Sequence, residues 1–141
     1  MKTLKSMLAG IALLFICVAA NATVKTVNEK SPQTDVINTY IDAIAHGKIT
    51  NLDNVLGDDM QYNMQRGENV NTLNKQQLLD YLKNYSSANS TVTANTTVIT
   101  DEDDLYVVRI DFKYDDVLRS DVVTVSKAGG WQITKVVTSF K

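Results

Sequence analysis

The chain has 141 residues with 14 basic and 16 acidic side chains, which give a formal net charge of −2 at pH 7. A chain of this size forms one domain with a core large enough to need no disulfide. The weak negative charge argues against nucleic acid or an anionic lipid surface as a partner. With one cysteine, one histidine and no phosphate-binding motif in the sequence, we expect neither a metal site nor a cofactor.

The N-terminus has the pattern of a secretory signal peptide, which we place at residues 1–22. Lys2 and Lys5 precede an apolar run from Met7 to Ala20, and Ala22 provides the second small residue that a signal peptidase reads. The run is shorter than the roughly 20 residues that a membrane span needs. We therefore expect an exported protein, periplasmic or secreted, without a membrane span.

Cys17 leaves one alternative for the mature protein. A lipid anchor at this cysteine would hold the chain at a membrane, but Ile16 stands where a lipoprotein signal has a small residue. We favour simple cleavage after Ala22. That cleavage removes the only cysteine, and with it any disulfide or cysteine nucleophile.

Residues 23–33 are predicted as a polar, flexible lead-in, and residues 34–141 as the folded domain. Ser31 and Pro32 are typical of a helix start, and Gly47 is typical of a helix end. Between them, apolar residues recur every three or four positions and predict one buried stripe: Val36, Ile37, Tyr40, Ile41, Ile44 and Ala45.

Two more helices and one strand are predicted before the middle of the domain. A short helix is expected at residues 51–56, and Gly57-Asp58-Asp59 is expected to break it. Residues 60–65 alternate in polarity, which predicts a strand. Asn74 and Gln77 have the spacing of a capping box, so a third helix should begin there.

Residues 91–140 predict a four-stranded antiparallel meander that the rest of the chain has to cover. The alternation is clearest in residues 104–115, where one face carries Tyr106, Val108, Ile110, Phe112 and Tyr114. Short turn signals at 101–104, 115–116 and 128–130 leave no room for crossover helices. Neighbouring strands should therefore pair antiparallel.

Two Arg-x-Asp pairs interrupt this meander. Arg109 and Asp111 lie in one predicted strand, and Arg119 and Asp121 lie in the next. Periodicity favours a solvated sheet face with cross-strand ion pairs, each worth well under about 1 kcal/mol. The alternative is that some of these groups project into a concave site.

The amphipathic helices and the one-faced sheet can bury their apolar surfaces only against each other. We therefore expect an α+β fold. Its sheet should be strongly curved and antiparallel, with about five or six strands and with three helices packed on its concave face.

This order of elements resembles the nuclear transport factor 2-like superfamily, a cone-shaped fold that is also called cystatin-like. Within the superfamily, the chain is most similar to the bacterial proteins described as putative lumazine-binding. The resemblance covers Thr34 to Phe140. It is carried by VINTYIDAIAHGKITNLDNVLGDDMQYNMQRGE (36–68) and SDVVTVSKAGGWQITKVV (120–137). It implies the fold but not one function, because the superfamily contains enzymes, binding proteins and transport factors.

One class in the superfamily, the ketosteroid isomerases, holds an oxyanion with a helical Tyr and a protonated Asp and uses a second Asp as general base. The resemblance places Tyr40 and Asp121 at the two oxyanion positions and Met64 at the position of the base. Methionine cannot accept a proton, so the defining proton transfer lacks its agent.

Tyr40 and Asp121 have two interpretations. In an apolar cone, burial would favour a neutral Asp121, and the pair could hold a ligand carbonyl without reacting it. In the other interpretation, Tyr40 is a core residue with a satisfied hydroxyl, and Asp121 pairs with Arg109 or Arg119.

We expect a non-catalytic domain that forms a homodimer through its sheet, as this superfamily commonly does, and that binds a small apolar ligand. The expected pocket is lined by Tyr40, Tyr62, Met64, Asp121 and Trp131. One alternative is an isomerase- or cyclase-like enzyme acting on an apolar carbonyl compound, with His46 or Asp59 displaced into the role of the base. Another is a protein-interaction module whose cone is filled by its own side chains. In the simpler interpretations, His46 caps its helix and Trp131 packs against the end of the sheet.

Overall fold

The computed structural model of the chain describes residues 31–85 and 92–141. The expected signal peptide and most of the lead-in lie outside these ranges. In chain order the elements are α2 (Pro32–His46), α3 (Leu52–Val55), β1 (Leu56–Arg66), β2 (Asn69–Leu73), α4 (Lys75–Tyr85), β3 (Thr93–Asp101), β4 (Leu105–Lys113), β5 (Leu118–Ser126) and β6 (Gln132–Phe140).

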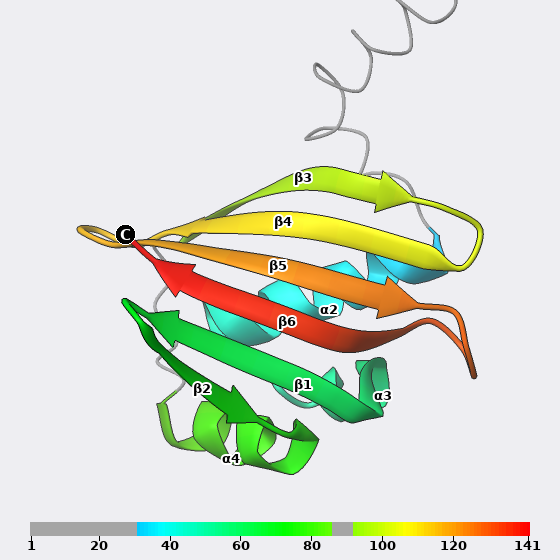
Figure 1. Cartoon of the computed structure of the whole chain (residues 1–141), viewed down its shortest axis with the longest axis horizontal. Helices are drawn as coiled ribbons and strands as arrows, with labels where there is room; N and C mark the ends of the chain where they lie inside the picture. The colour runs from blue at the N-terminus through cyan, green and yellow to red at the C-terminus, as the bar shows by residue number, and fades with distance from the viewer. Residues whose placement is uncertain (1–30, 86–91) are drawn as a thin grey trace, which may run out of the picture.

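The six strands form one open sheet in the order β2-β1-β6-β5-β4-β3. In Figure 1 the helices α2 and α3 lie behind this sheet. The helix α4 packs against β2, at one edge of the sheet, and against the adjacent strand β1. Register shifts in the β1·β6, β3·β4 and β5·β6 pairs mark irregularities of the kind that bend a strand. The α+β architecture is therefore confirmed, with the helices on one side of the sheet.

The sheet is mixed, whereas we expected antiparallel pairing throughout. The predicted meander β3 to β6 is antiparallel, but β1 and β6 run parallel. The short helix ends at Val55, before the expected break at Gly57-Asp58-Asp59, and Gly57 itself belongs to β1. A Cβ atom at Gly57 would lie 3.1 Å from the carbonyl oxygen of Ile133 on β6, so the absence of a side chain permits this close strand approach.

Strand β2 was not individually predicted. Four of its five residues are exposed, and the fifth is only partly buried. Such a strand has no alternation of apolar and polar residues to detect. It is held at the edge of the sheet by pairing with β1, after a turn in which Gly67 has a φ of +60°.

All three predicted helix caps are present. The Ser31 hydroxyl accepts from the Thr34 backbone N–H, and the Thr34 side chain accepts from the Ser31 N–H, which forms a capping box. Gly47 ends α2 in the left-handed conformation with a φ of 69°. At the start of α4, the Asn74 side chain accepts from the Gln77 N–H, and the Gln77 side chain accepts from the Asn74 N–H.

The core lies between the helices and the inner face of the sheet. Strand β4 alternates as predicted, because Tyr106, Val108, Ile110 and Phe112 are buried and the residues between them are not. From α2, the buried side chains include Val36, Ile37, Tyr40 and Ala45. Across the described ranges, no helix is both long and apolar enough to cross a membrane.

Candidate functional site

A buried polar network lies on the inner face of the sheet. Its members come from four elements: Tyr40 from α2, Tyr62 from β1, Arg119 and Asp121 from β5, and Thr138 from β6. The β5·β6 register places Asp121 opposite Thr138. Residues that face each other across two strands share one face of the sheet. The register of the paired strands therefore brings Asp121 and Thr138 together on the inner face.

Asp121 is the centre of this network and is fully buried. Tyr40 donates its hydroxyl hydrogen to Asp121 Oδ2 over 2.5 Å. Arg119 donates from Nε to Oδ1 over 2.9 Å and from Nη2 to Oδ2 over 2.8 Å. This two-pronged contact is the one that a guanidinium makes with an ionised carboxylate. The expectation of a neutral Asp121 thus gives way to the ion pair with Arg119 that was the other interpretation.

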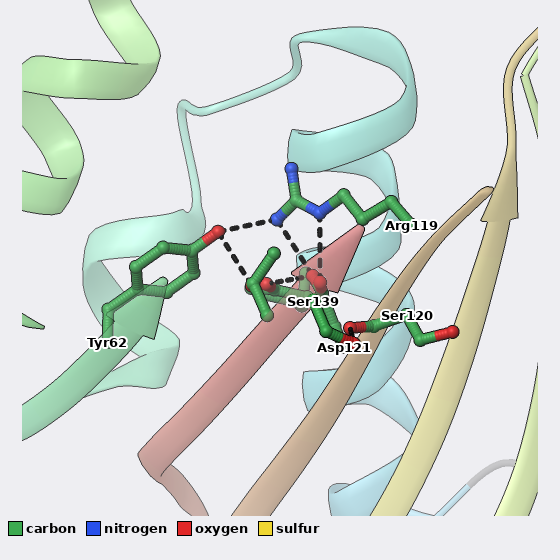
Figure 2. Close-up of polar contacts among 7 residues, drawn as sticks. Tyr62, Arg119, Ser120, Asp121 and Ser139 are labelled. Atoms are coloured by element: carbon green, nitrogen blue, oxygen red, sulfur yellow. Dashed lines mark hydrogen bonds and ion pairs between the residues drawn. The ribbon is translucent and has the colours of Figure 1, made fainter. Parts of the chain in front are cut away.

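Tyr62 extends the network from the other side of Arg119. Its hydroxyl oxygen accepts from Arg119 Nη2 over 2.7 Å and from Thr138 Oγ1 over 2.9 Å. Figure 2 shows the guanidinium of Arg119 between the Tyr62 hydroxyl and the Asp121 carboxylate. Tyr40 is completely buried, and Tyr62 is 1% exposed.

Burial also controls protonation in the network. It raises the pKa of Tyr40 well above the ordinary value, and the Asp121 carboxylate adds to this rise. Burial is the main cause at Tyr62 as well; Arg119 opposes it, and the pKa of Tyr62 rises to about 12. Burial alone would lower the pKa of Arg119, but Asp121 raises that pKa well above its usual range. Both tyrosines therefore stay protonated donors at neutral pH, and Arg119 stays charged.

Arg119 also stacks between two aromatic rings. Its guanidinium carbon lies 5.6 Å from the centroid of Phe112 and 5.9 Å from that of Phe140. The guanidinium of Arg66 lies over Phe140 as well, at 5.4 Å. We call Arg66, Phe140, Arg119 and Phe112 the Arg–Phe row, because they occupy neighbouring positions on β1, β6, β5 and β4. Contacts of this kind fix the plane of a guanidinium.

The structure brings together four of the five expected pocket residues. Tyr40, Tyr62 and Asp121 are in the network, and Met64 lies opposite Thr138 and is 8% exposed. Trp131 does not join them. It precedes β6, and at about 3.3 Å per residue it lies roughly 20 Å from Thr138 along the strand. Its side chain is partly buried and packs against the core, as the simpler interpretation expected.

The two alternative bases lie outside the network. His46 is exposed in the last turn of α2. Asp59 is exposed near the start of β1, where it lines an open hollow. Among the residues that the structure describes, neither has a hydrogen bond or ion pair with Tyr40, Tyr62 or Asp121.

Arg119 and Thr138 are the members that we did not place in the site from the sequence. A signal for Arg119 was present, because Arg119 and Asp121 are in phase with Val123 and Val125, the buried residues of β5. By contrast, Arg109 and Asp111 are out of phase with the buried face of β4. Thr138 is buried and has no comparable signal, because threonine is common on either face of a strand.

Three of the open hollows in the described part of the chain lie away from the network. The first, of about 490 Å³, lies between the start of β1, the end of β2 and the start of α4. A second hollow, of about 430 Å³, lies at the β4–β5 turn. A third of about 420 Å³ lies beside Lys75, which bridges Asp53 and Asp58. None of the three touches Tyr40, Met64 or Asp121.

Metal-binding side chains do not gather in the described ranges. No group of three or more His, Cys, Asp or Glu residues there is arranged to hold a metal ion. The only carboxylate of the network, Asp121, accepts three hydrogen bonds from Tyr40 and Arg119. The chemistry available at the site is therefore hydrogen bonding from arginine and tyrosine donors.

Several solved structures share this fold. A nuclear transport factor 2-like protein of unknown function from Methylobacillus flagellatus is 20% identical, with a TM-score of 0.66 over 84% of this chain and 94% of that one. A protein from Parabacteroides distasonis described as a putative ketosteroid isomerase is 17% identical, with a TM-score of 0.60 over 86% and 96%. A cystatin-like fold protein from Burkholderia xenovorans is 15% identical, with a TM-score of 0.62 over 83% and 92%. At these identities the similarity shows the fold alone.

The sequence comparisons place the chain more narrowly. No curated protein matches it. Residues 28–139 match the family described as "Putative lumazine-binding". This match covers nearly all of the described domain, from before the Ser31 cap to Ser139 in β6. The chain therefore belongs to the putative lumazine-binding family.

Proposed function

We propose that this chain is an exported domain that binds a small, largely apolar ligand and catalyses no reaction on it. The carrying observation is the buried network of Arg119, Asp121, Tyr40 and Tyr62 on the inner face of the sheet. A buried ion pair costs so much desolvation that well-packed apolar residues are often as stable or more stable. Stability alone therefore does not account for the network, and this supports a role in ligand recognition.

Two further observations support a ligand at this face. The family description names a small heterocyclic molecule as its ligand. In addition, the Thr96 hydroxyl is buried without a hydrogen-bond partner among the described residues. Thr96 is opposite Ile110, which is opposite Asp121, so all three face the same side. A buried hydroxyl without a partner is costly, and a bound molecule or water would satisfy it.

We propose the absence of catalysis from the side chains that would have to accept a proton at the site. Met64 occupies the position where the resemblance implies a general base, and a thioether does not take up a proton at neutral pH. Asp121 is already engaged by three donors. His46 and Asp59 are exposed outside the network.

Export and dimerisation are part of the same proposal. The basic start and short apolar run of residues 1–22 support export rather than lipid anchoring at Cys17. On the outer face of the sheet, Val122 pairs with Val137, and both are only partly buried. The helices α2 and α3 lie behind the sheet in Figure 1. A partly apolar sheet face of this kind supports a homodimer through the sheet.

The test is a ligand screen on two matched variants. We expect lumazine, or another compound from a library of planar carbonyl compounds, to raise the melting temperature of the wild-type chain. Calorimetry should then show binding weakened at least about tenfold in Asp121→Asn, because the network reorganises. Asp111 lies on the outer face, so the Asp111→Asn variant should bind the ligand as tightly as the wild type does. If no compound in the library binds, the cone is filled and the interaction-module alternative replaces this proposal.

A further inference from the structure

Arg119 has donors that the network does not use. A guanidinium offers five N–H groups. Nε donates to Asp121, and Nη2 donates to Asp121 and to Tyr62. In the part of the chain that the structure describes, no atom accepts from Nη1, and Figure 2 shows this nitrogen directed away from Asp121 without a dashed line. The side chain is nevertheless about nine-tenths buried, with Arg119 at 8% exposed.

Tyr62 has an unused donor beside it. Its oxygen accepts from Arg119 and from Thr138, so both of its lone pairs are occupied. The hydroxyl hydrogen of Tyr62 has no acceptor among the described residues, and the raised pKa of Tyr62 keeps that hydrogen in place at neutral pH. Nη1 and Nη2 are neighbours in the guanidinium plane, and Nη2 contacts the Tyr62 oxygen. The two unused donors therefore belong to groups that are already in contact through Nη2.

The Arg–Phe row indicates how a ligand would reach these donors. Exposure rises along the row, from Phe112 at 0% and Arg119 at 8% to Phe140 at 37% and the exposed Arg66. The ring faces of Phe112 and Phe140 flank the guanidinium of Arg119. They hold its plane fixed and leave its Nη1 edge free. A ligand would thus approach past Phe140, at the end of the sheet where β1 and β6 finish.

We propose that Arg119 Nη1 and the Tyr62 hydroxyl together bind a neutral acceptor oxygen, such as a carbonyl, of a planar apolar ligand that enters past Phe140. This inference rests on the proposed ligand-binding function and specifies its ligand class. A planar apolar body would pack against the exposed part of Phe140, which is 37% exposed. Two convergent donors suit one oxygen with two lone pairs.

A neutral acceptor fits the charges better than an anion does. Arg119 and Asp121 are in contact and already cancel each other at the buried end of the row. A carboxylate placed there would be an excess buried charge, which is costly without its own partner. Arg66 is the next cation along the row, but it is exposed and lies on the far side of Phe140.

Three probes of nearly equal shape test this proposal on the wild-type chain by calorimetry. They are 1-acetonaphthone with a ketone, 1-ethylnaphthalene with no acceptor, and 1-naphthoate with a carboxylate. We expect the ketone to bind at least about tenfold more tightly than the hydrocarbon, because two donors gain an acceptor. The carboxylate should bind no more tightly than the ketone.

Two variants test whether Tyr62 and Arg119 cause the preference for the ketone over the hydrocarbon. Tyr62→Phe removes one donor, and Arg119→Lys keeps the charge but removes Nη1. Each should reduce the ketone-to-hydrocarbon ratio toward one while hydrocarbon binding is retained. Tyr114→Phe and Arg109→Lys are the matched controls outside the network and should keep the wild-type ratio. Tyr62→Phe and the wild-type comparison remain decisive if Arg119→Lys does not fold.

The possible outcomes separate this inference from the proposed function. Equal binding of ketone and hydrocarbon overturns the acceptor site but leaves a ligand-binding domain. Carboxylate binding that is much tighter than ketone binding overturns the neutral class in favour of an anion site. No binding of any probe or of lumazine removes the proposed function, and the inference falls with it.

Discussion

The two Arg-x-Asp pairs have the same residue spacing and opposite surroundings. On β4, Arg109 Nε lies 3.3 Å from Asp111 Oδ2, and the two side chains are 50% and 25% exposed. On β5, Arg119 Nη2 lies 2.8 Å from Asp121 Oδ2, and the corresponding values are 10% and 0%. The outer pair faces solvent, whereas the inner pair is enclosed by the core.

This difference shows that phase, and not composition, decides what a charged pair does in a sheet. The outer pair adds little to stability because water solvates each partner almost as well. In the inner pair, each charge depends on the other and on the tyrosines around it. Only the inner pair can therefore orient a group for recognition.

Removal of one inner carboxylate should produce the largest effect. We expect Asp121→Ala to lower the free energy of unfolding by about 3–5 kcal/mol, because Arg119 and Tyr40 lose a buried partner. Asp111→Ala should cost about 1 kcal/mol or less, since it loses an exposed ion pair and one hydrogen bond from Ser120. Urea denaturation of both variants measures the contrast. Equal losses would mean that burial does not distinguish the pairs.

The second-largest effect should come from high pH, which weakens the inner network. The pKa of Tyr62 is about 12 in the folded chain against an ordinary value of 10.0, so the folded state holds its proton longer than the unfolded state. The resulting stability is fully present below pH 10 and is lost as the pH rises toward 12. Two pKa units correspond to about 2–3 kcal/mol.

Tyr62→Phe provides the control for this pH dependence, since lysines also titrate in the same range. Urea midpoints measured between pH 9 and 12 should fall more steeply for the wild type than for the variant. Parallel curves would show that Tyr62 ionises as freely in the folded chain as in the unfolded one.

The smallest effect is expected at the outer pair. Arg109→Gln should change the free energy of unfolding by less than about 0.5 kcal/mol. The remaining difference should vanish in 1 M salt, where the screening length is about 3 Å. Thermal denaturation at low and high salt measures both. A loss above about 1 kcal/mol that persists in high salt would assign Arg109 a structural role that its exposure does not suggest.

The sequence predicted those parts of the fold in which periodicity reports burial. Residues 104–115 alternate, so β4 and its buried face were predicted, and the Ser31 and Asn74 caps follow from local chemistry. Strand β2 has no apolar face and was missed. The parallel β1·β6 pairing joins distant segments, and no local pattern specifies it.

The candidate site was predicted less completely. Tyr40 and Asp121 were brought together by resemblance, and the structure places them in contact. The role of Arg119 depends on which face of β5 it occupies, and the interruption of the apolar pattern was interpreted as solvent exposure for both pairs. Trp131 was included although its position before β6 places it away from Thr138. The sequence does not show which hydrogen-bond donors of Arg119 have a partner and which, such as Nη1, have none among the described residues.

The parallel pairing of β1 with β6 also constrains how the chain can acquire its shape. Strand β6, the last in chain order within the domain, is an interior strand of the sheet, with β1 on one side and β5 on the other. Until residues near Phe140 are available, the first half of the domain and the preceding hairpins have no common partner. Such long-range closure is slow compared with local contacts. The domain should therefore remain incompletely folded until β6 is available, and the inner face of the sheet forms in the final step.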